Sequence, residues 1–229
     1  MTQQAESASD TVGTEPRYTV SEAAQLVRTT SQTLHRWLRG SVEGRDRKSQ
    51  EPLIIMDDPE GKYLSFYNLT EASFLAAYRH EGTPMQRVRR ALEYTQRELD
   101  IKRPLLRATF KTDGRNLFFK SGEEALINVS RSGQYAWPVV VDRHFRKLDF
   151  DNQGPVLMWL FDDRQTIGVT PSVSFGAPIV ARRGIRTELI AERFIAEENP
   201  REIAEDFMLY EEEVWDALRW ENASSRMAA

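Results

Sequence analysis

Residues 18–40 read YTVSEAAQLVRTTSQTLHRWLRG, and this stretch decides the N-terminal fold. Thr19 and Glu22 have the spacing of a capping box, in which each side chain accepts a hydrogen bond from the other residue's backbone N–H. Apolar residues then recur at the spacing of one helical face: Val20, Ala23, Ala24 and Val27. We therefore expect a short helix that ends before Arg28.

A second short helix is expected after a break at residues 28–30. We interpret Ser31 as its N-cap and Gly40 as its stop. Its buried face should carry Leu34, Trp37 and Leu38, and its outward face Gln32, Thr33, His35, Arg36 and Arg39. Two short helices with a tight break, the second polar and basic on its outer side, are typical of a helix-turn-helix.

The outward face of the second helix suits DNA. A recognition helix fits the major groove, where Gln and Arg hydrogen-bond base edges and Thr or Arg contact phosphate. The predicted DNA-binding residues on it are Ser31, Gln32, Thr33, His35, Arg36 and Arg39. A plain helical hairpin with a solvated polar face is the alternative interpretation.

A wing is predicted downstream, from strands at 53–56 and 63–66 around a turn at 57–61. Beside this hairpin lies a Gly/Ser-rich loop that carries Arg45, Arg47 and Lys48. These cations would contact phosphate or the minor groove, and a solvated loop is the alternative.

The motifs at 18–24 and 33–37 resemble the opening of MerR-type DNA-binding domains over about 60 residues. That family commonly has Gly at the break between the two helices, where this chain has Arg28 or Thr29. The resemblance implies a DNA-binding winged helix-turn-helix.

The middle of the chain changes from helical to β-rich patterns. Capping-box spacings at 68–71 and 83–86 predict helices to about His80 and Ile101. The second would carry an arginine row off its apolar stripe, interpreted as a solvated face or a DNA-backbone contact: Arg87, Arg89, Arg90 and Arg97. Short apolar runs with turn signals follow over 104–170.

Acidic residues and a histidine in the β-rich segment raise the alternative of a nuclease or metal site. They are Asp142, His144, Asp149, Asp151, Asp162 and Asp163. Their spacing matches no metal motif, and several stand where turns are expected, so we interpret them as surface turn residues. The sequence also lacks a nucleophile elbow, a Walker loop and a dinucleotide fingerprint, so we predict no enzyme, no catalytic residue, no metal and no cofactor.

Three helices are predicted near the C-terminus, at about 188–196, from Asn199 and at about 211–222. Asn199, Pro200 and Glu202 provide an N-cap, a helix-compatible N1 and an acidic N3. The last helix should bury Val214, Ala217 and Leu218 and begins with three glutamates that suit the positive end of the helix dipole.

This C-terminal part resembles a small prokaryotic three-helix domain through Gly176–Arg186, Ile203–Phe207 and Glu213–Leu218. That domain, long labelled only as a domain of unknown function, recurs in antitoxins encoded beside PIN-domain ribonucleases. Tyr210 departs from the family, which usually has Thr or Ser as the cap of the last helix. Together with the MerR-like front half, the chain resembles a long VapB-type antitoxin.

The resemblance implies that the front half binds the operator of its own operon, while the back half holds and neutralises a VapC-like PIN-domain ribonuclease. An inserted arginine would neutralise the carboxylates of such an active site. The candidate toxin-binding residues are Arg182, Arg183, Arg186, Arg219, Trp215 and Trp220. Each arginine has an intradomain or solvated alternative, and each tryptophan the alternative of core packing. A homodimer is expected because operators are commonly palindromic, with residues 83–101 as a candidate interface.

The composition of the chain excludes several kinds of site and favours others. The 229 residues hold no cysteine, so disulfides and thiolate metal sites are excluded. No apolar run is long enough to span a membrane, and the N-terminus lacks a secretory pattern, so we expect a cytoplasmic protein without membrane contact. The net charge of −4 divides into about +5 over 17–111 and −5 over 171–229, which favours a polyanion partner for the first half only.

The predicted fold class is α+β, mainly α: a winged helix-turn-helix, a β-rich middle and a three-helix module. The expected organisation is a disordered tail at 1–16, a DNA-binding domain with extra helices at 17–103, a β-rich segment at 104–170, the module at 171–223 and a tail at 224–229. Three alternatives stay open. The chain would be a MerR-like regulator that senses a small molecule, an enzyme with an acidic metal site, or a protein whose C-terminal module is a second helix-turn-helix.

Overall fold

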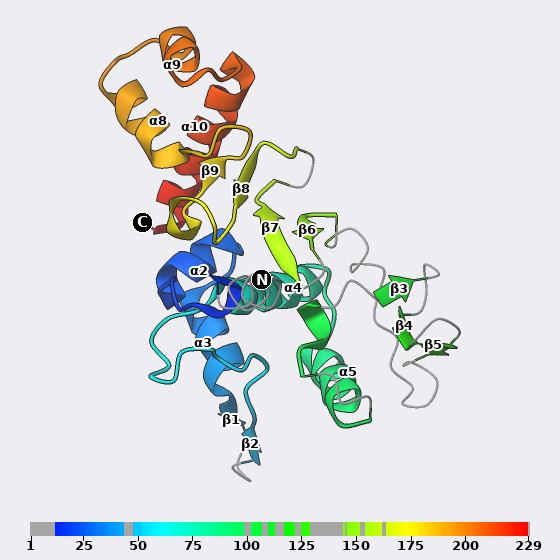
Figure 1. Cartoon of the computed structure of the whole chain (residues 1–229). Coiled ribbons are helices and arrows are strands. Elements are labelled where there is room, and N and C mark those ends of the chain that lie inside the picture. The colour runs from blue at the N-terminus through cyan, green and yellow to red at the C-terminus, as the bar shows by residue number, and fades with distance from the viewer. Residues whose placement is uncertain are drawn as a thin grey trace, which may run out of the picture. The chain divides into compact units, whose positions relative to one another are not determined.

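The structure is a computed structural model that mixes helices with antiparallel sheets (Figure 1). It describes residues 12–43, 48–98, 102–106, 110–112, 117–121, 125–128, 144, 146–151, 154–161 and 164–228. The chain divides into two compact units. The N-terminal unit comprises 14–146 and 150–155, and the C-terminal unit comprises 147–149 and 156–229 together with the first 13 residues.

The N-terminal unit begins with the two predicted short helices, α2 (Val20–Leu26) and α3 (Ser31–Arg39). The capping box of α2 is confirmed, because the Thr19 hydroxyl accepts from the Glu22 N–H and the Glu22 carboxylate accepts from the Thr19 N–H. The N-cap of α3 is Thr30 and not Ser31. Thr30 has extended backbone angles, and its hydroxyl accepts from the Thr33 N–H, so the first helical residue is Ser31.

Left-handed residues end both helices. Arg28 has φ 54° and stands in the break, where the resembling family commonly has Gly. Gly40 follows α3 with φ 74°, which confirms it as the stop. The turn at Arg28 therefore forms without glycine, at the steric cost that a side chain pays in the left-handed region.

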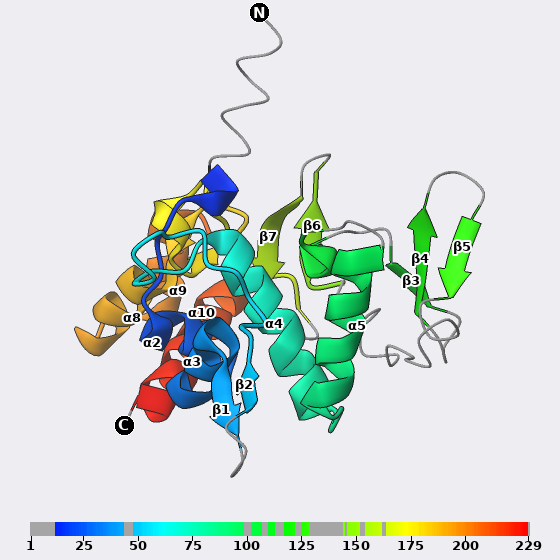
Figure 2. The same cartoon turned by 90° about the horizontal axis from the view of Figure 1, so that it is seen from below.

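The hairpin after α3 differs from the predicted one. The observed strands are β1 (Ser41–Glu43) and β2 (Lys48–Gln50), which pair antiparallel and extend from the end of α3 (Figure 2). The predicted strands at 53–56 and 63–66 are wrong. The N–H groups of Leu53 and Ile54 donate instead to the Trp37 carbonyl, and Leu64 makes only an isolated bridge with Tyr18.

Two longer helices complete the core of this unit. Helix α4 (Phe66–His80) is buried over most of its length, and α5 (Met85–Glu98) buries Val88, Leu92 and Thr95. The cap of α4 is Ser65, three residues before the predicted Asn68, and Asn68 closes the capping box as the third helical residue. Residues 99–101, at the predicted end of α5, lie outside the described residues.

The β-rich part contributes to two sheets. The sheet β3 (Phe110–Thr112), β4 (Leu117–Ser121) and β5 (Ala125–Asn128) is antiparallel and follows the 3-10 turn η1 (Pro104–Leu106). The second sheet has the order β10-β9-β8-β7-β6. Its strands are β6 (Leu148–Phe150), β7 (Pro155–Trp159), β8 (Ile167–Val169), β9 (Ile179–Val180) and β10 (Ile185–Arg186). Residue 170, where we place a domain boundary from sequence, therefore lies between two paired strands of one sheet.

Three helices follow the second sheet: α8 (Thr187–Ile195), α9 (Pro200–Phe207) and α10 (Glu211–Ala228). Asn199 caps α9 with Pro200 at its start, as predicted. Val214, Ala217 and Leu218 of α10 are buried, also as predicted, although α10 runs six residues beyond the predicted Asn222. Tyr210 has no capping hydroxyl in the position of the family's Thr or Ser, and its N–H donates to the Glu213 carboxylate instead.

Candidate DNA-binding and partner-binding surfaces

Helix α3 presents one polar stripe. Gln32, His35, Arg36 and Arg39 are exposed, and their spacing of i, i+3, i+4 and i+7 places them on one face. Leu34, Trp37 and Leu38 are buried on the opposite face, as predicted. Among the residues that the structure describes, no hydrogen bond or ion pair engages the side chains of Gln32, Arg36 and Arg39. The stripe is therefore chemically available for base edges and phosphates.

One of the predicted α3 contacts, Thr33, does not lie on the outward face. Thr33 is only 8% exposed, and its hydroxyl accepts from the Thr30 hydroxyl at 2.9 Å, so it belongs to the helix cap and not to the outward face. Ser31 is exposed as the first residue of the helix. Arg45 and Arg47 lie outside the described residues, and so does the side chain of Lys48, although its backbone belongs to β2.

The segment after the hairpin fixes the end of α3. The Trp37 carbonyl accepts from the N–H groups of Leu53 and Ile54 at 2.7 and 3.1 Å. Ile54 is buried, and Arg89 of α5 donates to the carbonyl of Glu51 at 2.5 Å. Arg89, predicted as part of a solvated row or a DNA-backbone contact, therefore holds this segment. The polar stripe of α3 is thereby attached to the core of the N-terminal unit.

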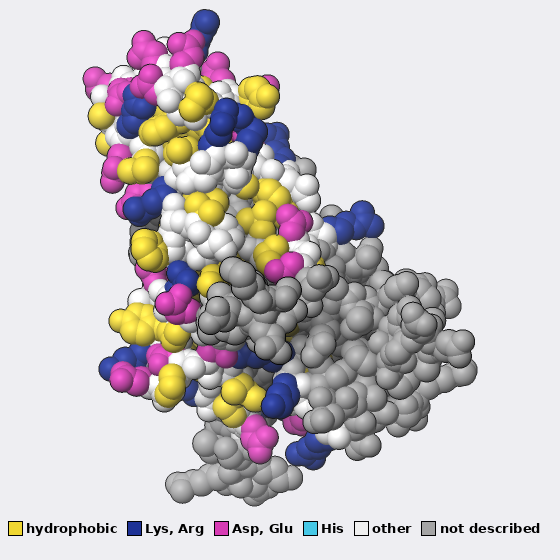
Figure 3. All heavy atoms as spheres, viewed as in Figure 1, with side chains coloured by type: hydrophobic (Ala, Val, Ile, Leu, Met, Phe, Trp, Pro, Cys, Tyr) yellow, Lys and Arg dark blue, Asp and Glu magenta, His cyan; other side chains and the backbone are white. Residues whose placement is uncertain are grey.

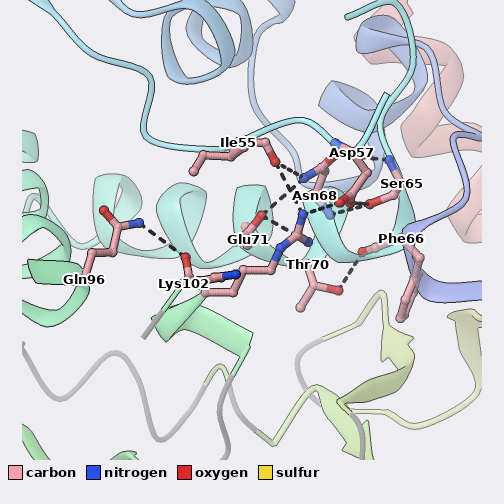
Figure 4. Close-up of polar contacts among 10 residues, drawn as sticks. Ile55, Asp57, Ser65, Phe66, Asn68, Thr70, Glu71, Gln96 and Lys102 are labelled. Carbon is pink, nitrogen blue, oxygen red and sulfur yellow. Dashed lines mark hydrogen bonds and ion pairs between the residues drawn. The ribbon is translucent and has the colours of Figure 1, made fainter. Parts of the chain in front are cut away.

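A buried polar network holds the other end of the same segment (Figure 4). Asn68 donates to the Ile55 carbonyl at 2.8 Å and to the Glu71 carboxylate at 3.3 Å, and its own side-chain oxygen accepts from the Asp57 N–H at 3.0 Å. Arg103 forms an ion pair with Asp57 and lies 3.8 Å from Glu71. The network joins the segment to α4 and to the residue just before η1.

Glu71 is the most perturbed group of this network. Its burial raises the pKa of the carboxyl to about 7, although Arg103 and the hydrogen bond from Asn68 favour the charged form. Desolvation prevails because Arg103 is 3.8 Å away and is shared with Asp57. Sequence reasoning missed this network. The signal for it is a glutamate inside a run of apolar and small residues that α4 buries.

Arg182 makes several polar contacts within the C-terminal unit. Its guanidinium donates to both carboxylate oxygens of Glu213, donates to the Met208 carbonyl at 2.8 Å and lies 4.3 Å from the centre of the Tyr210 ring. Partial burial of the Glu213 carboxyl raises its pKa, but the hydrogen bonds from Arg182 and from the Tyr210 N–H outweigh this effect, so the pKa of Glu213 is lowered. Arg182 therefore orders the start of α10.

The other predicted toxin-binding arginines differ in the groups that their side chains contact. Arg186 pairs with the exposed Glu188, and Arg219 pairs with Asp216, a buried carboxylate that also accepts from Arg164. Arg183 is exposed, and the contact described for it is a hydrogen bond of 3.3 Å to the Met208 carbonyl. Among the four candidates, Arg183 is the one whose cation has no carboxylate in ion-pair range in the part of the chain described.

The two predicted tryptophan anchors differ in their exposure to solvent. Trp220 is 3% exposed and packs edge-on against Phe161 at 6.2 Å, so the structure places it in the core of its own unit. Trp215 is 45% exposed and contacts Phe194 of α8. Phe194 and Ile195 stand four residues after Ile190 and Ala191, a spacing typical of one apolar helix face, but both are exposed.

Two of the acidic and histidine residues of the middle segment, His144 and Asp151, make structural contacts, and Asp149 is exposed on β6. His144 is buried, its Nε2 lies 2.8 Å from the Ser73 hydroxyl, and its ring packs against Phe74. Asp151 accepts from the Gly154 N–H, as a turn residue does. Asp142, Asp162 and Asp163 lie outside the described residues. Within the described ranges, no three His, Asp or Glu side chains lie together as a metal site.

None of the described helices combines the length and the apolar character needed to cross a membrane.

Two family models match separate parts of the chain. Residues 16–92 match a family described as "Putative DNA-binding HTH domain", and residues 167–220 match a family described as "Protein of unknown function (DUF433)". The chain is 25% identical over 224 residues to a protein named "Putative antitoxin VapB45" from Mycobacterium tuberculosis, covering 89% of this chain and 92% of that protein.

The fold has a solved counterpart. A crystal structure of Rv2018 from Mycobacterium tuberculosis matches with a TM-score of 0.66 and 24% identity, over 89% of this chain and 98% of that one. The chain is thus similar over most of its length to a protein named as an antitoxin, and its residues 16–92 are similar to a DNA-binding helix-turn-helix family.

Proposed function

We propose that this chain is an antitoxin that represses its own operon through its N-terminal unit and neutralises a PIN-domain ribonuclease through its C-terminal unit. The observation that carries the DNA-binding half is the exposed stripe of Gln32, His35, Arg36 and Arg39 on a helix whose other face is buried. A helix with this division of faces inserts into the major groove without exposing its core.

The hairpin β1–β2 would serve as the wing. It follows α3 directly, and the residues between its strands include Arg45 and Arg47. A basic hairpin tip in this position would contact the phosphates beside the groove that α3 enters, which would make the domain a winged helix-turn-helix of MerR type. A homodimer would present two such stripes to the halves of a palindromic operator.

The C-terminal unit would hold the ribonuclease. Support comes from the likeness to a protein named as an antitoxin along nearly the whole chain, and from two available side chains. Arg183 is exposed and would neutralise the metal-binding carboxylates of a PIN-type active site. Trp215 is half-exposed and would anchor the complex, since tryptophan is enriched in interface hot spots.

Co-expression tests the two halves separately. The chain is produced without a tag together with the tagged ribonuclease encoded beside its gene, and the complex is purified on the tag. We expect a stoichiometric complex that is inactive on RNA and regains activity when the chain is removed, and binding of the free chain to DNA from upstream of its own gene. Recovery of the ribonuclease alone and fully active would refute the antitoxin half and leave a DNA-binding regulator.

A further inference from the structure

Helices α8 and α10 expose a group of large apolar side chains to solvent. Phe194, Ile195 and Trp215 are 40%, 79% and 45% exposed. The rings of Phe194 and Trp215 meet edge-on with their centres 6.0 Å apart, so these two side chains form one patch across the two helices. The cores of the same helices are already filled by Ile190 and Val214, which are fully buried. Exposed aromatic side chains beyond the needs of the core mark an interaction surface.

Glutamates flank this apolar group. Glu192 precedes Ile195 by one turn of α8, and Glu211 and Glu212 precede Trp215 by one turn of α10; all three are exposed. The Glu211 carboxylate accepts from the Trp215 ring N–H at 3.2 Å. We call these three glutamates together with Phe194, Ile195 and Trp215 the acidic aromatic face. Figure 3 shows acidic, basic and hydrophobic side chains interspersed over the region of α8 and α9.

Two cations on the same helices, Arg193 and Arg219, are engaged by carboxylates outside this face. Arg193 of α8 is held by Glu198 and Asp206, and it lies over the Phe207 ring. Arg219, one turn after Trp215, is held by the buried Asp216. The face is therefore apolar at its centre and negative at its rim, and it repels nucleic acid and anionic membranes.

A complementary partner must have an apolar recess surrounded by cations. A ribonuclease presents such a rim, because the path along which it holds an RNA strand needs Lys and Arg side chains for the phosphates and apolar or aromatic surfaces for the bases. The metal-binding carboxylates of its active centre do not fit, since they would repel Glu192, Glu211 and Glu212.

We infer that the acidic aromatic face docks on the positively charged RNA-binding surface of the ribonuclease and competes with the substrate strand. This inference rests on the proposed function and deepens it: the glutamates take the place of phosphates, and Trp215 and Phe194 take the place of bases. Inhibition would then include exclusion of RNA as well as any contact with the metal centre.

The test uses the full chain and the ribonuclease encoded beside it, inactivated at a catalytic carboxylate so that RNA stays intact. A fluorescent 2′-O-methyl RNA oligonucleotide is the competitor. We expect the wild-type chain to displace this RNA from the ribonuclease. The variant E192K/E212K should displace it with an affinity weakened about tenfold or more, and W215A should weaken it similarly.

E60K/E81K, which changes two exposed glutamates of the N-terminal unit by the same total charge, is the matched control and should behave as wild type. Far-ultraviolet circular dichroism and melting establish that each variant is folded. The inference is overturned if E192K/E212K displaces RNA like the control, if the chain and RNA bind the ribonuclease together, or if W215A changes the oligomeric state of the chain alone, which would assign the face to a second copy. If the wild-type chain does not bind the ribonuclease at all, the proposed function fails and the inference fails with it.

Discussion

The Nε2 atom of His80 lies 3.1 Å from the carbonyl oxygen of Arg28, and this contact joins the end of α4 to the break of the helix-turn-helix. Because a carbonyl only accepts, the His80 ring must carry its proton on Nε2. The carbonyl it reaches belongs to a left-handed residue, with φ 54°. The break is thus held from outside by a helix of the core, which explains how a turn that commonly contains glycine forms around arginine.

Replacing Arg28 by glycine should stabilise the N-terminal unit. Arg28→Gly removes the steric cost of a left-handed side chain, about 1–2 kcal/mol in the free energy of unfolding, and this gain should exceed the cost of the unfolded-state freedom that glycine adds, about 0.5–1 kcal/mol. Chemical denaturation followed by tryptophan fluorescence measures the difference. Thr29→Gly is the matched control, because Thr29 does not have a positive φ and glycine there only adds unfolded-state freedom. Equal or lower stability of Arg28→Gly would contradict the strain assigned to this turn.

Gly40 should tolerate no side chain. Its φ is 74°, and a Cβ atom there would stand 2.0 Å from the Gln50 carbonyl oxygen. Gly40→Ala must therefore displace β2 from the end of α3, and we expect weaker DNA binding together with a loss of about 2–3 kcal/mol in stability. Gly61→Ala separates the two causes, since Gly61 also has a positive φ of 65° but has no atom within 4 Å of its Cβ position. A similar loss in both variants would show that the clash at Gly40 is relieved.

The α3 stripe predicts how DNA affinity responds to truncation. Arg36→Ala and Gln32→Ala should each weaken binding to DNA from the chain's own promoter by about 1–3 kcal/mol if the side chain meets a base edge. A phosphate contact by Arg36 would instead reduce the slope of log affinity against log salt by about one. Arg79→Ala, which removes an exposed cation from α4, is the control and should leave both quantities unchanged. Wild-type affinity in all three variants would place the DNA interface elsewhere.

The buried Glu71 predicts a pH dependence of stability. Its pKa is raised from 4.5 to about 7, so between these values the folded protein keeps a proton that the unfolded chain releases. The free energy of unfolding therefore falls as pH rises through this window. Glu71→Gln keeps the shape without the charge. It should match wild type below pH 4.5 and exceed it by up to about 3 kcal/mol at pH 8.

Denaturation midpoints of wild type and Glu71→Gln from pH 4 to pH 8 measure this difference. Glu60→Gln, in the exposed turn before α4, controls for the removal of one formal charge. A constant difference between wild type and Glu71→Gln across the range would contradict the assignment, because it would mean that Glu71 ionises alike in the folded and unfolded states.

Local patterns predicted the helices well. The capping box of Thr19, the stop at Gly40 and the cap at Asn199 depend on residues within one turn of each other, and all three are confirmed. The predicted hairpin at 53–56 and 63–66 failed because tertiary contacts outweighed strand propensity. The Trp37 carbonyl took the N–H groups of Leu53 and Ile54, and Ser65 became a helix cap.

The candidate site residues were likewise predictable where they depend on local spacing, and not where they depend on contacts with distant parts of the chain. The α3 stripe follows from helical spacing, so the sequence predicted it except for Thr33, whose hydroxyl pairs with that of Thr30. Partner assignments of the C-terminal arginines depend on residues far along the chain, such as Glu213 for Arg182, and periodicity carries no information on them. The acidic aromatic face was missed because the pairs Ile190/Phe194 and Ala191/Ile195 have core-like spacing, while only the packing of α8 against α10 decides which members are covered.

The central claim is tested most directly by titrating the ribonuclease encoded beside this gene with the purified chain while RNA cleavage is followed. The account predicts that cleavage stops when the two proteins reach a fixed stoichiometric ratio, and that Arg183→Glu shifts this end point to higher concentration. Undiminished cleavage at a large excess of folded, DNA-binding chain would contradict it.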